Sequence, residues 1–180
     1  MANYAPSTRE RISDLVAGMR LQTDVFDCAD YIDHDSTTTG QYELFNVYGR
    51  IMLLQLYIEA ITVWGAGAAV ISFTYTSSDP VVAVAEISDA CASVATLAEG
   101  LRVVWVGGAV ATAAVITASA GISDVICVNP IILGTQSGEG TIGMLTATAG
   151  LASGTAQAFM NYVPLERGAY VTANSAPTAP

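Results

Sequence analysis

The chain contains no lysine, a single histidine and few charged residues of either sign. Its 180 residues include six arginines and 16 acidic residues, which gives a formal net charge of -10 at pH 7. A nucleic-acid surface needs a basic stripe that releases counterions, and an anionic membrane surface attracts clusters of lysine and arginine. We therefore expect neither nucleic acid nor a membrane as a partner.

Cysteine is also scarce, and its spacing fits neither a disulfide framework nor a zinc site. Cys28, Cys91 and Cys127 lie far apart in the chain and form no CxxC pair. We interpret them as reduced, small apolar side chains, consistent with assembly in a reducing cytoplasm. The first residues lack the basic and apolar regions of a secretory signal.

Long uncharged stretches dominate the second half of the chain. From Val103 to Leu165 the only formal charges are Asp124 and Glu139. Residues 60–78 and 103–123 are long enough to span a membrane, but they lack leucine and contain Gly, Thr and Ser, and no cluster of basic residues flanks them, which argues against spanning helices. A surface this neutral is explained if other copies or a large partner cover it. The composition thus points to a component of an assembly.

Short strands are predicted from residue 41 onward. Residues 50–62 alternate between a wholly apolar face and a mixed face, as expected of a strand covered on one side. The apolar face of that strand would comprise Met52, Leu54, Leu56, Ile58 and Ala60. Further strands are predicted at 42–47, 69–76, 102–106, 109–119, 122–128, 131–133, 139–148, 155–163 and 169–173.

Glycine and polar clusters mark the turns between these strands. Tyr48-Gly49 predicts a turn with glycine at a position of positive φ. Ser77–Pro80 predicts a second turn, and Gly134–Gly143 is interpreted as a hairpin loop. Regularly spaced short strands with glycine-rich turns predict an antiparallel barrel or sandwich.

Helical patterns are confined to two segments. Glu86–Gly100 places apolar residues at near-helical spacing with Gly100 as a C-cap, which predicts one short helix, with an irregular strand as the alternative. Ser7–Arg20 has a capping box at its start and could form a helix. The predicted fold is therefore mainly β, an antiparallel barrel or sandwich with one short helix and an extended or helical N-terminal arm. We divide the chain into an N-terminal arm and acidic segment (1–40), a β domain (41–173) and a flexible C-terminal tail (174–180).

No catalytic constellation is evident in the sequence. His34, the sole histidine, lies in an acidic segment, and no nucleophile motif accompanies it. The glycine-rich residues 134–143 carry no Lys or Arg and resemble no phosphate-binding loop. Residues 24–35 contain five aspartates that could supply oxygen ligands for calcium, but their spacing is not that of an EF-hand. A solvated acidic segment, or one that pairs with arginines of a neighbour, is the preferred interpretation. We assign no catalytic, cofactor-binding or metal-binding residue and expect no cofactor.

Two segments resemble a known group of proteins. Tyr42–Thr62 (YELFNVYGRIMLLQLYIEAIT) resembles the opening strands of small structural proteins of tailed bacteriophages, and Phe159–Ala173 (FMNYVPLERGAYVTA) resembles their closing hairpin. The resemblance implies an all-β decoration, or cement, protein that assembles as a small oligomer, often a trimer, on the capsid exterior. It implies no enzymatic activity. The first 40 residues depart from the pattern.

The resemblance sets the functional expectation. We expect a virion protein, assembled in the host cytoplasm, that oligomerises on the outer surface of a phage head and stabilises it, with the major capsid protein as partner. Arg9, Arg11 and Arg20 would be the candidate contacts to an acidic capsid surface, through bidentate pairing. Another virion component, such as a head spike, fibre base or tail protein, is the alternative, followed by a cell-surface binding module. An enzyme is not expected, because no residues can be assigned as nucleophile, base and oxyanion donor.

Overall fold

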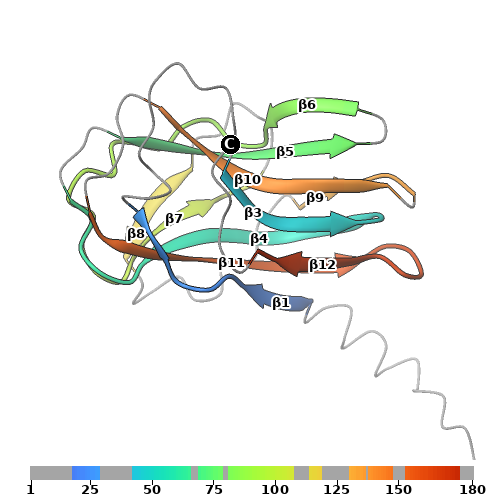
Figure 1. The fold of residues 1–180 in the computed structure, drawn as a ribbon, viewed down its shortest axis with the longest axis horizontal. Coiled ribbons are helices and arrows are strands. Elements are labelled where there is room, and N and C mark those ends of the chain that lie inside the picture. Colours follow the sequence, from blue (N-terminus) through green and yellow to red (C-terminus); the bar gives the residue numbers. More distant parts are fainter. Residues whose placement is uncertain are drawn as a thin grey trace, which may run out of the picture.

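The computed structural model of the chain describes residues 18–28, 42–65, 69–78, 81–107, 114–118, 130–136, 138–147 and 153–174. In these residues twelve strands form two antiparallel sheets that pack together as a β-sandwich (Figure 1). The prediction of a mainly β, antiparallel fold is confirmed, and of its two forms the sandwich is correct. Among the same residues there is no helix, so none that could span a membrane.

The larger sheet, sheet A, has seven strands. Its main path runs in the order β1 (Met19–Gln22), β11 (Thr155–Pro164), β4 (Ile51–Ala60), β7 (Leu101–Trp105) and β8 (Val115–Ala118). Two short strands lie off this path: β2 (Phe26–Asp27) pairs with β11, and β9 (Ile131–Leu133) pairs with β4.

Sheet B has five strands, in the order β12 (Tyr170–Ala173), β3 (Tyr42–Tyr48), β10 (Glu139–Ala147), β5 (Val70–Ser78) and β6 (Val81–Glu86). Two sequence predictions change here. Ser77 and Ser78, expected in a turn, extend β5, and β6 was not predicted as a strand. The segments expected at 122–128 and at the C-terminal tail after residue 174 lie outside the described residues.

Three connections at one end of the sandwich cross from one sheet to the other. They leave Tyr48, Leu133 and Pro164, and we call this end the Arg50 end. The turn at Gly49 is confirmed with a φ of 73°, but β3 and β4 on either side of it lie in different sheets. The predicted hairpin loop at 134–143 is wrong, because β9 and β10 also lie in different sheets and Glu139–Gly143 belong to β10.

The first and second of these connections are in close backbone contact. Gly134 has a φ of 85°, and a Cβ there would meet the carbonyl oxygen of Gly49 and come within 3.5 Å of the Cα of Arg50. Only glycine fits both the left-handed conformation and the close approach. The two connections thus form one packed corner.

A bulge interrupts the predicted alternation of β4. Gln55 pairs with Asn161 and Leu53 pairs with Tyr162, so Leu54 is an extra residue opposite β11. Because an extra residue reverses which side chains face inward, the buried face changes along the strand. Its fully buried members are Ile51, Leu53, Leu56 and Ile58, each 0% exposed. The predicted apolar face of β4 is therefore correct beyond the bulge and wrong before it.

The short helix predicted over Glu86–Gly100 is absent. Instead, the segment runs along the edge of β5: the amides of Ile87, Cys91 and Val94 donate to the carbonyl oxygens of Phe73, Ile71 and Ala69 at 2.8, 2.9 and 2.9 Å. The side chain of Ser88 also accepts a hydrogen bond from the Phe73 amide at 2.9 Å. Three or four residues of this segment lie opposite every two residues of the neighbouring segment. Its apolar side chains therefore point inward at every third or fourth position, which is also the spacing of a helix.

Residues 18–28, which the sequence analysis placed in the N-terminal arm and acidic segment, are part of the sandwich. β1 pairs with β11 from Met19↔Tyr162 to Gln22↔Phe159, so the helix predicted over Ser7–Arg20 does not include its last two residues. Thr23, between β1 and β2, is 1% exposed. Its hydroxyl accepts a hydrogen bond from the Ala158 amide at 3.0 Å. The arm before residue 18 lies outside the described residues.

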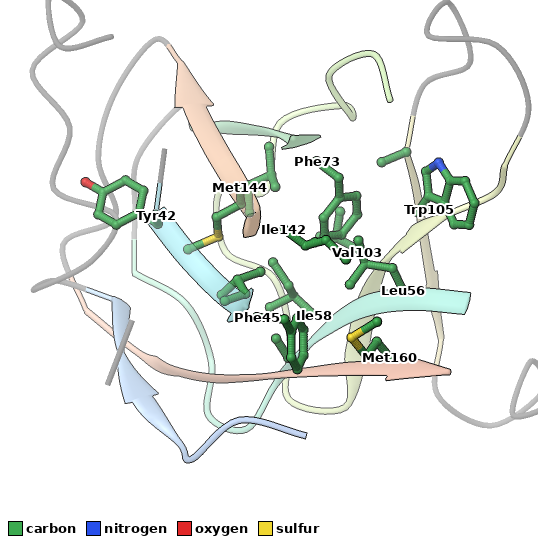
Figure 2. Packing of buried hydrophobic residues seen from close by; sticks show 14 of the residues in the cluster. Tyr42, Phe45, Leu56, Ile58, Phe73, Val103, Trp105, Ile142, Met144 and Met160 are labelled. Carbon is green, nitrogen blue, oxygen red and sulfur yellow. The ribbon is translucent and has the colours of Figure 1, made fainter. Parts of the chain in front are cut away.

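The core fills the space between the two sheets (Figure 2). Sheet A contributes side chains such as Leu56, Val103 and Trp105, and sheet B contributes Phe45 and Phe73, all buried. Trp105 donates its indole N–H to the Ile87 carbonyl oxygen at 3.0 Å, so its one polar atom is satisfied. Each sheet thus has one face in the core and one outer face.

Candidate interaction surfaces

The Arg50 end gathers exposed arginine and apolar side chains. In the described part of the chain the exposed arginines are Arg20, Arg50 and Arg167. Arg50 and Arg167 belong to the connections that cross between the sheets. Arg20 lies on the edge strand β1 and pairs with Asn161, three residues before the end of β11.

Large apolar side chains are also exposed on the elements that carry these arginines and on β9. Met19 is 53% exposed, Ile132 63% and Leu165 39%. Ile132 pairs with Met52, the second residue of β4. Because β4 begins directly after Arg50, Ile132 lies at the Arg50 end of sheet A. We define the end surface as Met19, Arg20, Arg50, Ile132, Leu165 and Arg167. Mixed guanidinium and apolar side chains are typical of protein interfaces, in which arginine is enriched.

One acidic residue at this end, Glu166, helps to hold two connections together. The Glu166 carboxylate accepts a hydrogen bond from the Arg50 amide at 3.0 Å. It therefore holds the connection after β11 against the turn between β3 and β4.

The predicted contact residues fall partly outside the described chain. Arg20 is exposed on β1, on the outer face of sheet A, where it pairs in register with Asn161. Arg9 and Arg11 lie outside the described residues. Arg50 and Arg167, which join Arg20 in the end surface, were not singled out from the sequence, because nothing in it shows that the two connections meet at one end.

The aspartate segment is described only in part. Asp24 and Asp27 lie in and beside β2, whereas His34 and the other three aspartates lie outside the described residues. Within the residues that are described, no group of three or more His, Cys, Asp or Glu side chains lies close enough together to hold a metal ion.

The outer face of sheet A is occupied by its own side chains. Tyr57 stacks on Phe159 with ring centroids 4.9 Å apart, and the Arg102 guanidinium lies 4.6 Å from the Tyr57 centroid. Arg102 also pairs with Glu59, Nε to Oε2, at 2.7 Å. Since Tyr57 is only 3% exposed, this network covers the part of the sheet around Tyr57.

The outer face of sheet B presents two rows of side chains near the Arg50 end. Register aligns Tyr170, Tyr48 and Glu139 across β12, β3 and β10. The adjacent row is Thr172, Asn46, Thr141 and Thr76. Tyr48 and Tyr170 stack with ring centroids 4.5 Å apart. An aromatic row thus lies beside a row of hydroxyl and amide groups.

A depression of about 290 Å³ opens on this face. It is lined by Asn46, Tyr48, Thr76, Ser77, Glu139, Gly140 and Thr141. A second depression of about 220 Å³ shares Tyr48 and Glu139 with it and continues to Glu166 and Arg167. The sequence analysis missed these residues, because the two rows exist only once the register of four strands is known.

Two of the three cysteines lie in the core and are free thiols, as predicted; Cys127 is outside the described residues. Burial, with the nearby Asp27 carboxylate as a smaller cause, raises the pKa of the Cys28 thiol from 9.0 to about 12. Burial likewise raises the pKa of Cys91. Both side chains are therefore neutral at physiological pH and act as apolar groups.

The fold and these surfaces define an antiparallel β-sandwich with a mixed arginine and apolar end. Comparison with protein-family models, with curated proteins and with solved structures found no match to this chain.

Proposed function

We propose that this chain is a structural protein of a tailed-phage virion, a decoration protein that oligomerises on the outer surface of the head and stabilises it. The proposal includes the major capsid protein as its partner, a homotrimer as its assembly and no enzymatic activity. It draws on the resemblance of Tyr42–Thr62 and Phe159–Ala173 to small virion proteins.

The end surface is the observation that carries the proposal. A chain with a net charge of -10 exposes Arg50, Arg167, Ile132 and Leu165 at one end of the sandwich. Met19 and Arg20 are exposed on the edge strand β1, which pairs with the C-terminal part of β11. Arginine forms bidentate pairs with carboxylates, and apolar side chains contribute most once water is excluded around them. The end surface therefore suits a contact with an acidic protein surface such as a shell.

A binding assay with phage heads purified without this chain tests the proposal. The triple variant Arg20→Ala, Arg50→Ala, Arg167→Ala should co-sediment with heads at least tenfold more weakly than the unaltered protein, because charge pairs at an interface lose their partners. Val63→Ala is the matched control: Val63 is 57% exposed near the opposite end of β4 and should not change binding. Equal binding of the triple variant and the control would contradict the proposal.

The arm is tested separately by removing residues 2–17. A deletion that continues to Arg20 would also remove Met19 and Arg20 from β1 and disturb pairing with β11. Native mass spectrometry of the same proteins measures their assembly state, for which we expect a trimer. A monomer at micromolar concentration, both free and after release from heads, would contradict the oligomer.

A further inference from the structure

We propose that the outer face of sheet B is a saccharide-binding site, centred on the depression beside Tyr48. The site is centred away from the end surface and shares only Arg167 with it, through the smaller depression. It does not depend on attachment to a shell. It would give the protein a second function, recognition of a neutral sugar.

The first argument is the pre-organised aromatic wall. Tyr48 lines both depressions, and stacking on Tyr170 at an interplanar angle of 16° fixes the orientation of its ring. The C–H groups of a pyranose carry partial positive charge and are attracted to the electron-rich face of an aromatic ring. A ring held in place before binding loses little conformational entropy when a ligand arrives.

The second argument is the polar floor. Asn46 and Thr141 lie side by side in the row next to Tyr48, and the Asn46 amide donates to the Asn174 side-chain oxygen at 2.7 Å. This bond fixes the orientation of the Asn46 side chain. Amide and hydroxyl groups both donate and accept hydrogen bonds, as the hydroxyl groups of a sugar require. Glu139 adds a carboxylate, which accepts from hydroxyl groups and repels anionic ligands.

The third argument is the absence of a cation in the floor of the larger depression. None of its seven lining residues is Arg, Lys or His, so phosphate and sulfate find no counter-charge there. A volume of about 290 Å³ is at the small end of ligand sites, which usually span about 300–1,000 Å³. One sugar ring fits this size, and the adjoining depression of about 220 Å³ allows a second. We therefore assign the site to a neutral mono- or disaccharide.

A titration followed by NMR tests the assignment. Isotope-labelled protein is titrated with glucose, galactose, N-acetylglucosamine, maltose and lactose, with glycerol as the non-cyclic control. We expect at least one sugar to shift the signals of Tyr48 and Thr141 with a Kd on the order of 1–10 mM, as a small ligand with few contacts allows. Glycerol should leave these signals unchanged.

Variants then locate the binding site. Tyr48→Leu and, independently, Thr141→Val should each weaken the affinity for that sugar at least fivefold, while thermal unfolding shows that the fold is retained. Phe159→Leu, an aromatic substitution on the outer face of sheet A, should leave the affinity unchanged. Thr141→Val gives a second measurement if the tyrosine variant fails to fold.

Three results would overturn the proposal. One is the lack of any sugar-dependent shift up to 50 mM, about five times the weakest expected Kd. Another is a set of shifts that maps to sheet A or to the opposite end of the sandwich. The third is a shift of Tyr48 that follows protein concentration instead of sugar concentration, since the face would then be a contact between copies. None of these results bears on binding to heads, so the two proposals fail separately.

Discussion

Three leucines in β4 allow a direct test of the bulge on which the two-sheet packing depends. Leu53 and Leu56 are both 0% exposed and belong to the core. Leu54 is half-buried and contacts the Gly18 backbone: its Cδ1 lies 3.1 Å from where a Gly18 Cβ would be. Uninterrupted alternation would instead place Leu54 and Leu56 on the same buried face and Leu53 on the other.

The expected magnitudes follow from burial. Replacing a fully buried leucine by alanine removes its transfer free energy and leaves a cavity, at a cost of about 3–5 kcal/mol. We expect this cost for Leu53→Ala and for Leu56→Ala. Leu54→Ala removes a partly solvated side chain outside the core and should cost about 1 kcal/mol.

Urea unfolding followed by tryptophan fluorescence measures these differences, because Trp64 and Trp105 are 1% and 2% exposed in the folded protein. Protein concentration must be held constant, since any oligomer makes the apparent free energy of unfolding depend on it. The slope of the free energy against urea should not change between variants, so that shifts of the midpoint report stability alone. Leu53→Met serves as the volume-conserving control and should cost less than about 1.5 kcal/mol.

The reasoning is refuted by one pattern in particular. If Leu54→Ala costs as much as Leu56→Ala while Leu53→Ala costs less than about 1 kcal/mol, then β4 alternates without a bulge. The pairing of Gln55 with Asn161 and of Leu53 with Tyr162 would then be incorrect.

Three further changes test other parts of the structure. Gly140→Ala should destabilise the fold by about 1–3 kcal/mol in thermal or urea unfolding, because its Cβ would lie 2.6 Å from the Thr76 carbonyl oxygen. The pKa of Cys28 is raised from 9.0 to about 12 by burial, so the unfolded chain loses its thiol proton first as pH rises. This contribution to the free energy of unfolding should be intact below pH 9.0. It should fall by up to about 1.4 kcal/mol per pH unit between pH 9.0 and about 12. Urea unfolding of Cys28→Ala should show a less steep fall over the same pH range. A double-mutant cycle with Arg102→Gln and Glu59→Gln should give a coupling of about 0.5–1 kcal/mol, since both side chains are partly exposed; a coupling near zero would show that the pair contributes nothing.

Strand positions were predictable because they depend on local signals. Glycine at position 49 and apolar residues on either side of it predict a turn between two strands, and the structure has both. The sequence could not show that these strands enter different sheets, because a short turn with positive φ serves a hairpin and a crossing equally well. Gly134 approaches Gly49 closely where the chain crosses between the sheets. This contact joins residues far apart in the sequence, so local sequence signals do not reveal it.

The errors share a physical cause, which is that backbone pairing can shift the side-chain period. A bulge at Leu54 changes which residues face inward without changing composition. Along Glu86–Gly100, Ile87, Cys91 and Val94 bond to alternate residues of β5 and of the position just before it. The resulting spacings of four and three match those of a helix. The rows on the outer face of sheet B were equally hidden, since Tyr48 and Tyr170 lie more than 100 positions apart in sequence and meet only through β12–β3 pairing.

Part of the scarcity of charge between Val103 and Leu165 follows from the position of two strands in the sandwich. Within this stretch, β10 lies between β3 and β5, and β11 lies between β1 and β4. Strands with neighbours on both sides bury their inward residues in the core and have their outward residues flanked by side chains of the adjacent strands. The monomer's own architecture therefore contributes to the neutrality of these two strands. The end surface, where arginine and apolar side chains are exposed, supports an external partner more directly than the scarcity of charge does.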